Sequence, residues 1–199
     1  RRRAGGGGRF LLRNGRGATL PAGQPLAKSE WIVAAELDDR GRESRIFLAA
    51  PVEEADLLEH VADQIEGEDT SEWDEEAGAV LARRRERLGA IVVRDSTLPE
   101  PDPDAVTAAL LDGIAREGLG ILPWTKAATQ LRDRLLFLRR HDERWPDVSE
   151  EALLGSLDEW LGPWVQGMRR RDDLQRLDMT KILEATLSWE ERAALDEAA

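Results

Sequence analysis

The chain has 199 residues, 41% of them hydrophobic and 5% aromatic, so it can bury one large core or two small ones and we do not expect disorder. The absence of cysteine excludes disulfides and thiolate metal sites, and the lack of an apolar run of roughly 20 residues excludes a membrane-spanning helix. A formal net charge of −12 argues against a nucleic-acid partner, because an acidic surface repels a polyanion.

The N-terminal segment departs from this acidic balance. Residues 1–30 carry a net charge of +6, because Glu30 is opposed by seven basic residues: Arg1, Arg2, Arg3, Arg9, Arg13, Arg16 and Lys28. A local phosphate-facing patch would have this distribution, although a solvated basic tail explains Arg1 to Arg3 equally well. The segment lacks the apolar core of a signal peptide, so we expect a cytoplasmic protein. Because the sequence begins with Arg1 and not Met, we also expect a piece of a longer protein.

Residues 9–52 organise the rest of the chain. Apolar residues alternate at a spacing of about two in RFLLRNGRGATL, SEWIVAAELDD and SRIFLAAPV, which is typical of consecutive antiparallel strands. Turn-forming residues separate these pieces at Asn14-Gly15, Pro21 to Gly23 and Asp38 to Gly41. We therefore predict a small antiparallel β-barrel.

A helix is expected near 53–66, since acidic residues open the segment and Leu57, Leu58 and Val61 follow at helical spacing. Gly67 would end the helix and residues 67–71 would form a polar loop.

A basic hairpin is expected near 72–93, turning between Glu75 and Gly78, although residues 79–87 also have helical propensity. On a strand, Arg83, Arg85 and Arg87 would share one face. This face would either contact phosphates or act as a charged edge that deters aggregation.

The proline-rich sequence LPEPDPD, residues 98–104, predicts a boundary between a domain at 1–97 and a helical domain at 98–199. Beyond it we expect short antiparallel helices in a bundle-like arrangement. Asp102, Ser149 and Ser188 are the predicted caps, and Gly162-Pro163 would stop the third helix. The fold class is therefore α+β.

Two features of the helical half have alternative explanations. Residues 125–140 carry a net charge of +4. We expect their basic side chains to form ion pairs with Asp158, Glu159 or Glu150, in preference to lining a path for nucleic acid. The five tryptophans of this half are expected mostly in the core, with an exposed one as an interface anchor or base-stacking platform: Trp124, Trp145, Trp160, Trp164 and Trp189.

Catalytic and metal-binding patterns are missing from the sequence. It has neither a GxxxxGK[ST] phosphate loop nor a Gly-x-Ser-x-Gly elbow, and His60 and His141 lack a partner at zinc-binding spacing. We therefore predict no catalytic, cofactor or metal residues here, and we do not expect this piece to be a catalyst alone.

The ordered string GRFLLRNGRGATLPAGQPLAKSEWIVAAELDDRGRESRIFLAAPVEEADLLEHV, RRRERLGAIVVRDSTLPEPDPDAV, GILPW, LLFLRRH, RWPDVSEEALLGSLDEWL and DLQRLD resembles one family over nearly the whole chain. It is similar to the C-terminal accessory part of the bacterial HrpB family of ATP-dependent DExH-box helicases. The resemblance implies an OB-like barrel followed by a family-specific region. It also implies ATP and Mg²⁺ sites in motor domains upstream of Arg1, outside this sequence.

The function predicted from these observations is accessory. The barrel would contact a single strand of nucleic acid, RNA in preference to DNA, and the helical part would brace the upstream motor domains of the same helicase. Trp31 and Phe47 are candidates for base stacking, although their strands favour core positions. The alternative is a protein-interaction module in which the helical half binds a partner. The candidate nucleic-acid-binding residues are Arg9, Arg13, Asn14, Arg16, Lys28, Arg83, Arg85 and Arg87.

Overall fold

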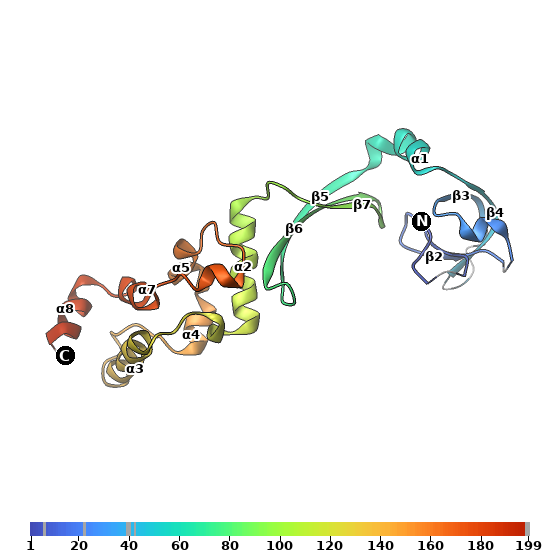
Figure 1. Cartoon of the computed structure of the whole chain (residues 1–199). Helices are drawn as coiled ribbons and strands as arrows, with labels where there is room; N and C mark the ends of the chain where they lie inside the picture. Colours follow the sequence, from blue (N-terminus) through green and yellow to red (C-terminus); the bar gives the residue numbers. More distant parts are fainter. Residues whose placement is uncertain (6, 22, 39–40, 42, 198–199) are drawn as a thin grey trace. The chain divides into compact units, whose positions relative to one another are not determined.

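The computed structural model describes residues 1–5, 7–21, 23–38, 41 and 43–197 (Figure 1). The chain divides into two compact units. The sheet unit comprises Arg1–Asp69 with Arg83–Thr97, and the helical unit comprises Thr70–Ala82 with Leu98–Ala199. Residues 70–82, which the sequence analysis assigned to the first domain, thus cluster with the helices.

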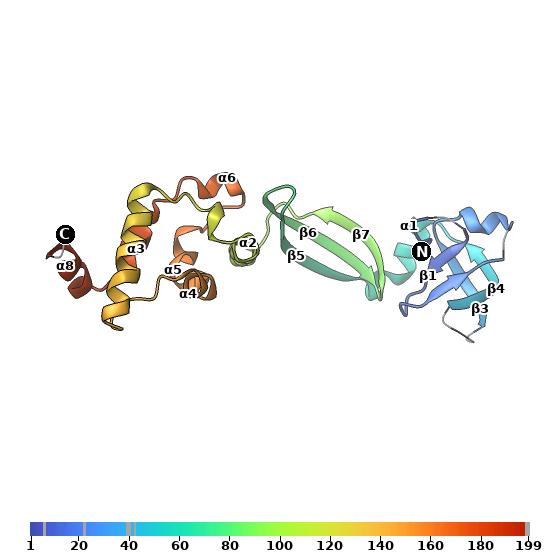
Figure 2. The same cartoon turned by 90° about the horizontal axis from the view of Figure 1, so that it is seen from below.

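Four strands form the first sheet in the order β1-β2-β4-β3 (Figure 2). They are β1 (Arg9–Leu11), β2 (Gly17–Thr19), β3 (Ile32–Asp38) and β4 (Glu43–Pro51), with a 3₁₀ turn η1 (Pro25–Lys28) after β2. The strands predicted within 9–52 are therefore confirmed. Of the predicted turns, Asn14-Gly15 connects β1 and β2, whereas Ala22, Asp39 and Arg40 lie outside the described residues.

The predicted barrel is not formed. The described residues contain two separate sheets, and β2 pairs with β4 in parallel, so the first sheet is not purely antiparallel either. Alternation of side chains identifies a strand but does not identify its neighbour, which explains why the sequence did not reveal this pairing. The α+β class is confirmed, and the OB-like assignment stays a prediction.

Residues 54–61 form helix α1 (Glu54–Val61), continued by the 3₁₀ turn η2 (Ala62–Gln64), which confirms a helix in the predicted segment. The predicted loop at 67–71 is wrong, because these residues belong to β5 (Glu66–Asp74). Polar residues occupy both faces of β5 along this stretch, so no alternation of hydrophobic side chains marks the strand in the sequence.

The second sheet has the order β5-β6-β7, with β6 at Ala79–Leu88 and β7 at Ile91–Thr97 (Figure 2). The predicted turn at 75–78 is confirmed, and residues 79–87 are strand and not helix. The apolar run 88–93 is interrupted by a second tight turn at Gly89-Ala90, where Gly89 has φ +58°.

Ion pairs cross the middle of this second sheet, where residues 66–69, 83–87 and 94–97 include no buried side chain. β5 and β6 are joined by Arg84–Asp69 at 3.4 Å and Arg87–Glu68 at 3.3 Å. β6 and β7 are joined by three more: Arg83–Asp95 at 2.7 Å, Arg85–Asp95 at 3.4 Å and Arg94–Glu86 at 3.8 Å. This stretch is therefore held by its backbone ladder and by exposed or partly exposed charge pairs.

The apolar contacts of the sheet unit lie in two clusters. Phe10, Ala18, Leu20 and Ile46 form the core of the first sheet. A second cluster contains Trp31, Leu88, Ile91 and Val93, with Leu57, Leu58 and Val61 of α1 packed against it. The second cluster joins the first sheet, α1 and the Gly89-Ala90 end of the second sheet.

The helices follow the proline-rich boundary, and several of them start at side-chain caps. Asp102 caps α2 (Pro103–Glu117), Thr125 caps α3 (Lys126–His141) and Ser149 caps α4 (Glu150–Gly155). The predicted third helix is divided at Ser156, after which come α5 (Leu157–Trp160) and the 3₁₀ turn η4 (Gly162–Trp164). Another 3₁₀ turn, η3 (Leu119–Ile121), follows α2.

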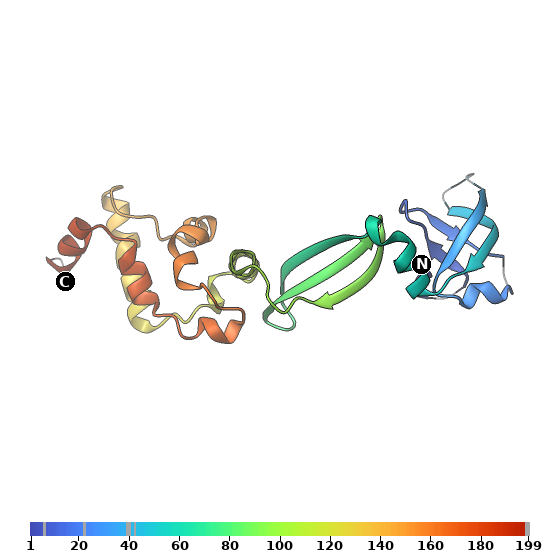
Figure 3. The same ribbon diagram turned by 90° about the horizontal axis from the view of Figure 1, so that it is seen from above.

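Three short helices end the chain: α6 (Arg171–Leu174), α7 (Met179–Ala185) and α8 (Trp189–Glu197). The capping box predicted before α8 is confirmed, because Ser188 N–H donates to Glu191 Oε2 at 2.6 Å and Glu191 N–H donates to Ser188 Oγ at 3.2 Å. α3 and α7 pack together and lie side by side in Figure 3. The apolar sides of the helices of this unit form one continuous core, which includes Leu110, Ile114, Leu135, Leu161 and Leu183.

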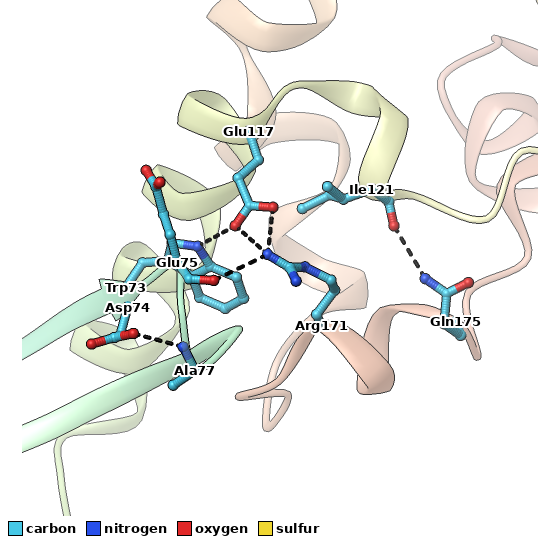
Figure 4. A network of polar contacts seen from close by, with 8 residues as sticks. All are labelled: Trp73, Asp74, Glu75, Ala77, Glu117, Ile121, Arg171 and Gln175. Atoms are coloured by element: carbon cyan, nitrogen blue, oxygen red, sulfur yellow. Dashed lines mark hydrogen bonds and ion pairs between the residues drawn. The ribbon is translucent and has the colours of Figure 1, made fainter.

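The tip of the β5–β6 hairpin is anchored within the helical unit by Trp73 (Figure 4). Its indole lies against Gly113 of α2, where a Cβ atom would come within 2.3 Å of the ring. Glu117 accepts from Trp73 Nε1–H at 2.7 Å and from Arg171 Nη2 at 2.7 and 2.6 Å. The backbone adds two hydrogen bonds, Val80 N–H to Arg169 O at 2.8 Å and Arg171 N–H to Gly78 O at 2.9 Å.

Replacing Glu117 by Gln is expected to lower the free energy of unfolding at pH 7 by about 1–2 kcal/mol, because the charge-assisted bonds to Arg171 are lost. The hydrogen bond from Arg171, with that from Trp73, holds the pKa of Glu117 below its ordinary 4.5. This stabilisation is therefore complete above pH 4.5 and is lost as the pH falls through the lower folded-state pKa. Urea titrations at pH 7 and at pH 3 should show the gap between wild type and Glu117→Gln narrowing in acid.

Asp112→Asn is the matched control, since Asp112 lies on the same helix and forms an exposed ion pair with Arg116. We expect a change below about 0.5 kcal/mol for it at either pH. An equal loss in both variants would show that the Glu117 network contributes no more than a surface ion pair.

Candidate nucleic-acid interface

The β1–β2 hairpin carries four of the predicted binding residues. Arg9 is exposed on β1, and Arg13, Asn14 and Arg16 form the loop between the strands. Asn14 Oδ1 accepts from Arg16 N–H at 3.1 Å, which closes the turn, and Arg13 Nη1 donates to the neutral amide of Gln64 at 2.5 Å. Arg16 Nη2 donates to Gly41 O at 3.0 Å. Within the described residues, Arg9 and Arg13 form no ion pair with a carboxylate.

Lys28 ends η1 and is exposed, with no ion pair to a described residue. It lies near the Arg9 end of the hairpin, because a Cβ at Gly8 would be 3.4 Å from the Cβ of Ala27. Arg9 lies on β1, and Arg13 lies in the turn that follows this strand. The structure thus places positive charge at both ends of one short hairpin.

The turn of the β6–β7 hairpin supports the loop that carries Arg13. Ala90 N–H donates to Arg13 O at 2.9 Å, and Gly89 approaches the same carbonyl so closely that a Cβ there would lie 2.5 Å from it. Gly89 is therefore required where the two hairpins meet. This contact depends on tertiary packing, so the sequence alone did not reveal it.

The three arginines of β6 that were predicted to bind nucleic acid have a different environment. Arg83 and Arg85 both bond to Asp95, and Arg87 is paired with Glu68. Arg83 and Arg85 hold the pKa of Asp95 below its ordinary value, so this carboxylate is ionised at neutral pH. A β-bulge between Glu86 and Arg87 interrupts the regular alternation that we expected to place all three side chains on one face.

The two aromatic candidates differ in burial. Trp31 is 4% exposed and belongs to the core, with the Arg1 guanidinium 5.2 Å from its ring centroid. Phe47 is 57% exposed, so its expected core position is wrong. Ser44 and Ile46 occupy the inner face of β4, and Phe47 consequently faces outward beside Arg45, whose guanidinium lies 5.9 Å from the ring. This pair was missed, although the i, i+2 spacing of Arg45 and Phe47 is visible in the sequence.

A cavity of about 610 Å³ opens beside the loop of the β1–β2 hairpin. Arg13 and Asn14 line it together with apolar side chains that include Trp31, Val33 and Leu37. Val33 and Leu37 are exposed, so this apolar wall is accessible from solvent. The sheet unit therefore places cationic and hydrogen-bonding groups next to an apolar hollow, as sites for single-stranded nucleic acid do.

Three arginines of α3 donate hydrogen bonds to main-chain carbonyls. Arg132 donates to Val148 O at 2.9 Å, Arg134 to Leu195 O at 2.6 Å and Arg139 to Trp145 O at 2.6 Å. The ion pairs that we expected with Asp158, Glu159 or Glu150 are not formed. Among the described residues, Arg139 instead forms an ion pair with Asp147 at 3.6 Å. These arginines therefore hold the segment after α3, which contains Trp145 and Val148, and helix α8, which contains Leu195, against α3.

The net charge is divided unequally between the units. The sheet unit contains 15 Lys and Arg against 15 Asp and Glu, whereas the helical unit contains 13 against 25, a net charge of −12. The helical unit is therefore the part of the chain expected to repel a nucleic acid, whereas the sheet unit has no net negative charge that would do so.

The described residues contain no group of three or more His, Asp or Glu side chains placed to hold a metal ion. None of their helices combines the length and apolar character needed to cross a bilayer.

The chain is similar to helicases of the DExH-box class. A family model described as "ATP-dependent RNA helicase HrpB, connector region" matches residues 64–98, the segment that contains β5, β6 and β7. ATP-dependent RNA helicase HrpB of Escherichia coli strain K12 is 37% identical over 201 residues, an alignment that covers 98% of this chain and 25% of that protein.

Two solved structures agree with this similarity. The crystal structure of E. coli DExH-box NTPase HrpB has 36% identity and a TM-score of 0.50, and that of E. coli DEAH/RHA helicase HrpB has 34% identity and a TM-score of 0.50. Each comparison covers 98% of this chain and 25% of the other. The predicted resemblance to HrpB is thus confirmed, and the chain spans about a quarter of the length of these relatives.

Proposed function

We propose that this chain is the accessory region of an ATP-dependent RNA helicase and that its sheet unit holds a single strand of nucleic acid, RNA in preference to DNA. The observation that carries the proposal is the similarity to HrpB over 98% of the chain. Under this proposal the motor domains of the same helicase act on the single strand that the sheet unit holds. ATP and Mg²⁺ belong to that motor, since the present sequence contains no phosphate loop.

The loop of the β1–β2 hairpin is the best-supported contact surface. Arg9, Arg13 and Lys28 present positive charge that no described carboxylate neutralises, and the apolar hollow beside Arg13 and Asn14 offers a place for unstacked bases. Arg83, Arg85 and Arg87 are secondary candidates, because a phosphate would compete with Asp95 and Glu68 for them.

Charge reversal at Arg13 and Arg16 tests the proposal. We expect Arg13→Glu with Arg16→Glu to weaken binding of a fluorescein-labelled 20-nucleotide single-stranded RNA about tenfold or more in an anisotropy titration. Each phosphate contact on a single strand contributes about 0.7 to the slope of log affinity against log salt, so the slope should fall by about 1.4. A DNA strand of the same sequence measures the preference for RNA.

The control is Lys126→Glu with Arg140→Glu on α3, which changes the net charge by the same amount. Both side chains are exposed and form no ion pair with a described residue. Unchanged affinity in the hairpin variant, or an equal loss in the α3 variant, would contradict the assignment to the hairpin.

A further inference from the structure

A second cavity lies in the helical unit, away from the residues assigned to nucleic acid. It has a volume of about 490 Å³ and lies between the segment before α4 and the elements α4, α5, η4 and α7. Its walls are mainly apolar and include Pro146, Leu153, Trp160, Pro163, Trp164 and Ile182. A volume of this size accommodates one or two large side chains of a ligand.

Trp164 gives the cavity an accessible aromatic wall. Its side chain is 43% exposed, whereas the neighbouring Trp160 is buried and donates its Nε1–H to Leu153 O at 2.8 Å. Trp160 is therefore fixed by the fold, and Trp164 remains available to an incoming apolar group. Exposed tryptophans beside a concave apolar surface are typical anchors of protein–protein interfaces.

The charged groups that line the cavity are both acidic. Asp147 accepts from the backbone N–H of Ser149 at 3.0 Å and is paired with Arg139 at 3.6 Å, and these contacts hold its pKa below the ordinary value. Glu159 is exposed, and its carboxylate has no hydrogen bond or ion pair with the described residues. The cavity lies in the unit that carries the whole net charge of −12.

We infer that this cavity binds a basic segment of a partner protein, which inserts an apolar side chain against Trp164 and places an adjacent Lys or Arg on Glu159. Apolar walls with a carboxylate at the edge are complementary to such a segment, whereas the same charges repel nucleic acid and acidic peptides. The inference does not depend on nucleic-acid binding by the sheet unit.

A model peptide tests the inference on the full chain. A fluorescein-labelled 12-residue peptide of alternating Leu-Leu and Lys-Lys pairs should bind in an anisotropy titration, and its counterpart with Glu in place of Lys should not. Glu159→Lys and Trp164→Ala should each weaken binding at least fivefold. Circular dichroism of each variant confirms that it is folded.

Two matched controls separate the cavity from the general acidity of the unit. Asp158→Lys makes the same charge change on the adjacent exposed residue, which does not line the cavity, and Trp189→Ala removes another exposed tryptophan. Both should change affinity less than twofold. Equal losses in Glu159→Lys and Asp158→Lys, equal binding of the two peptides, or no binding at 100 µM protein would overturn the inference.

Discussion

Trp73→Ala is expected to lower the free energy of unfolding of the helical unit by about 3–5 kcal/mol, the usual cost of deleting a buried large aromatic side chain. Trp73 is 6% exposed, lies against Gly113 and donates to Glu117 at 2.7 Å, so the change removes apolar contacts and a hydrogen bond together. Urea denaturation followed by far-ultraviolet circular dichroism measures the loss. Trp189→Ala, at a site 77% exposed, should cost less than about 0.5 kcal/mol.

A double-mutant cycle tests whether the contact with Gly113 is specific. Gly113→Ala alone would place a Cβ atom 2.3 Å from Cγ of Trp73 and should destabilise the unit strongly. In the Trp73→Ala background the added methyl group has room, so the same substitution should cost much less. Additive effects of the two changes would contradict the packing described for this pair.

Gly89→Ala is expected to destabilise the sheet unit by about 2–4 kcal/mol. Alanine would be held at φ +58°, which costs roughly 1–2 kcal/mol, and its Cβ would lie 2.5 Å from the carbonyl oxygen of Arg13. Relief of this clash must move the loop that carries Arg13, so affinity for the single-stranded RNA should fall as well. Urea denaturation and the anisotropy titration measure the two effects.

Gly167→Ala separates the two causes. Gly167 has φ +80° with no atom within 4 Å of the added Cβ, so it carries the conformational cost without a clash. We expect about 1 kcal/mol and unchanged RNA affinity for this variant. If Gly89→Ala were no worse than Gly167→Ala, the close approach of the two hairpins would not be needed for stability.

The sequence predicts most elements whose signal is local. The strands of 9–52 follow from alternation, and the helices after Leu98 follow from their caps, as at Asp102, Ser149 and Ser188. The first part of β5, residues 66–71, was missed because its side chains are polar on both faces. The absence of a barrel could not be foreseen, since side-chain period does not specify which strands become neighbours.

The candidate site shows the same limit. The basic residues were found from composition, but the partners that distinguish Arg13 from Arg83 depend on strand register and tertiary packing. For α3, local reasoning suggested carboxylate partners, whereas Arg132 and Arg134 reach carbonyls of residues that are distant in sequence. Phe47 was misplaced because the apolar character of a residue does not determine whether it lies on the buried or the exposed face of its strand.

The ion pairs across the middle of the second sheet make its local cohesion depend on ionic strength. Arg84–Asp69 is exposed and Arg87–Glu68 is partly exposed, and mobile ions screen such pairs more than they affect an apolar core. Raising the potassium chloride concentration should therefore promote transient separation of β5 from β6 in this stretch while the core of the helical unit keeps its protection against hydrogen exchange. A buffer chosen to weaken phosphate contacts would loosen this segment at the same time.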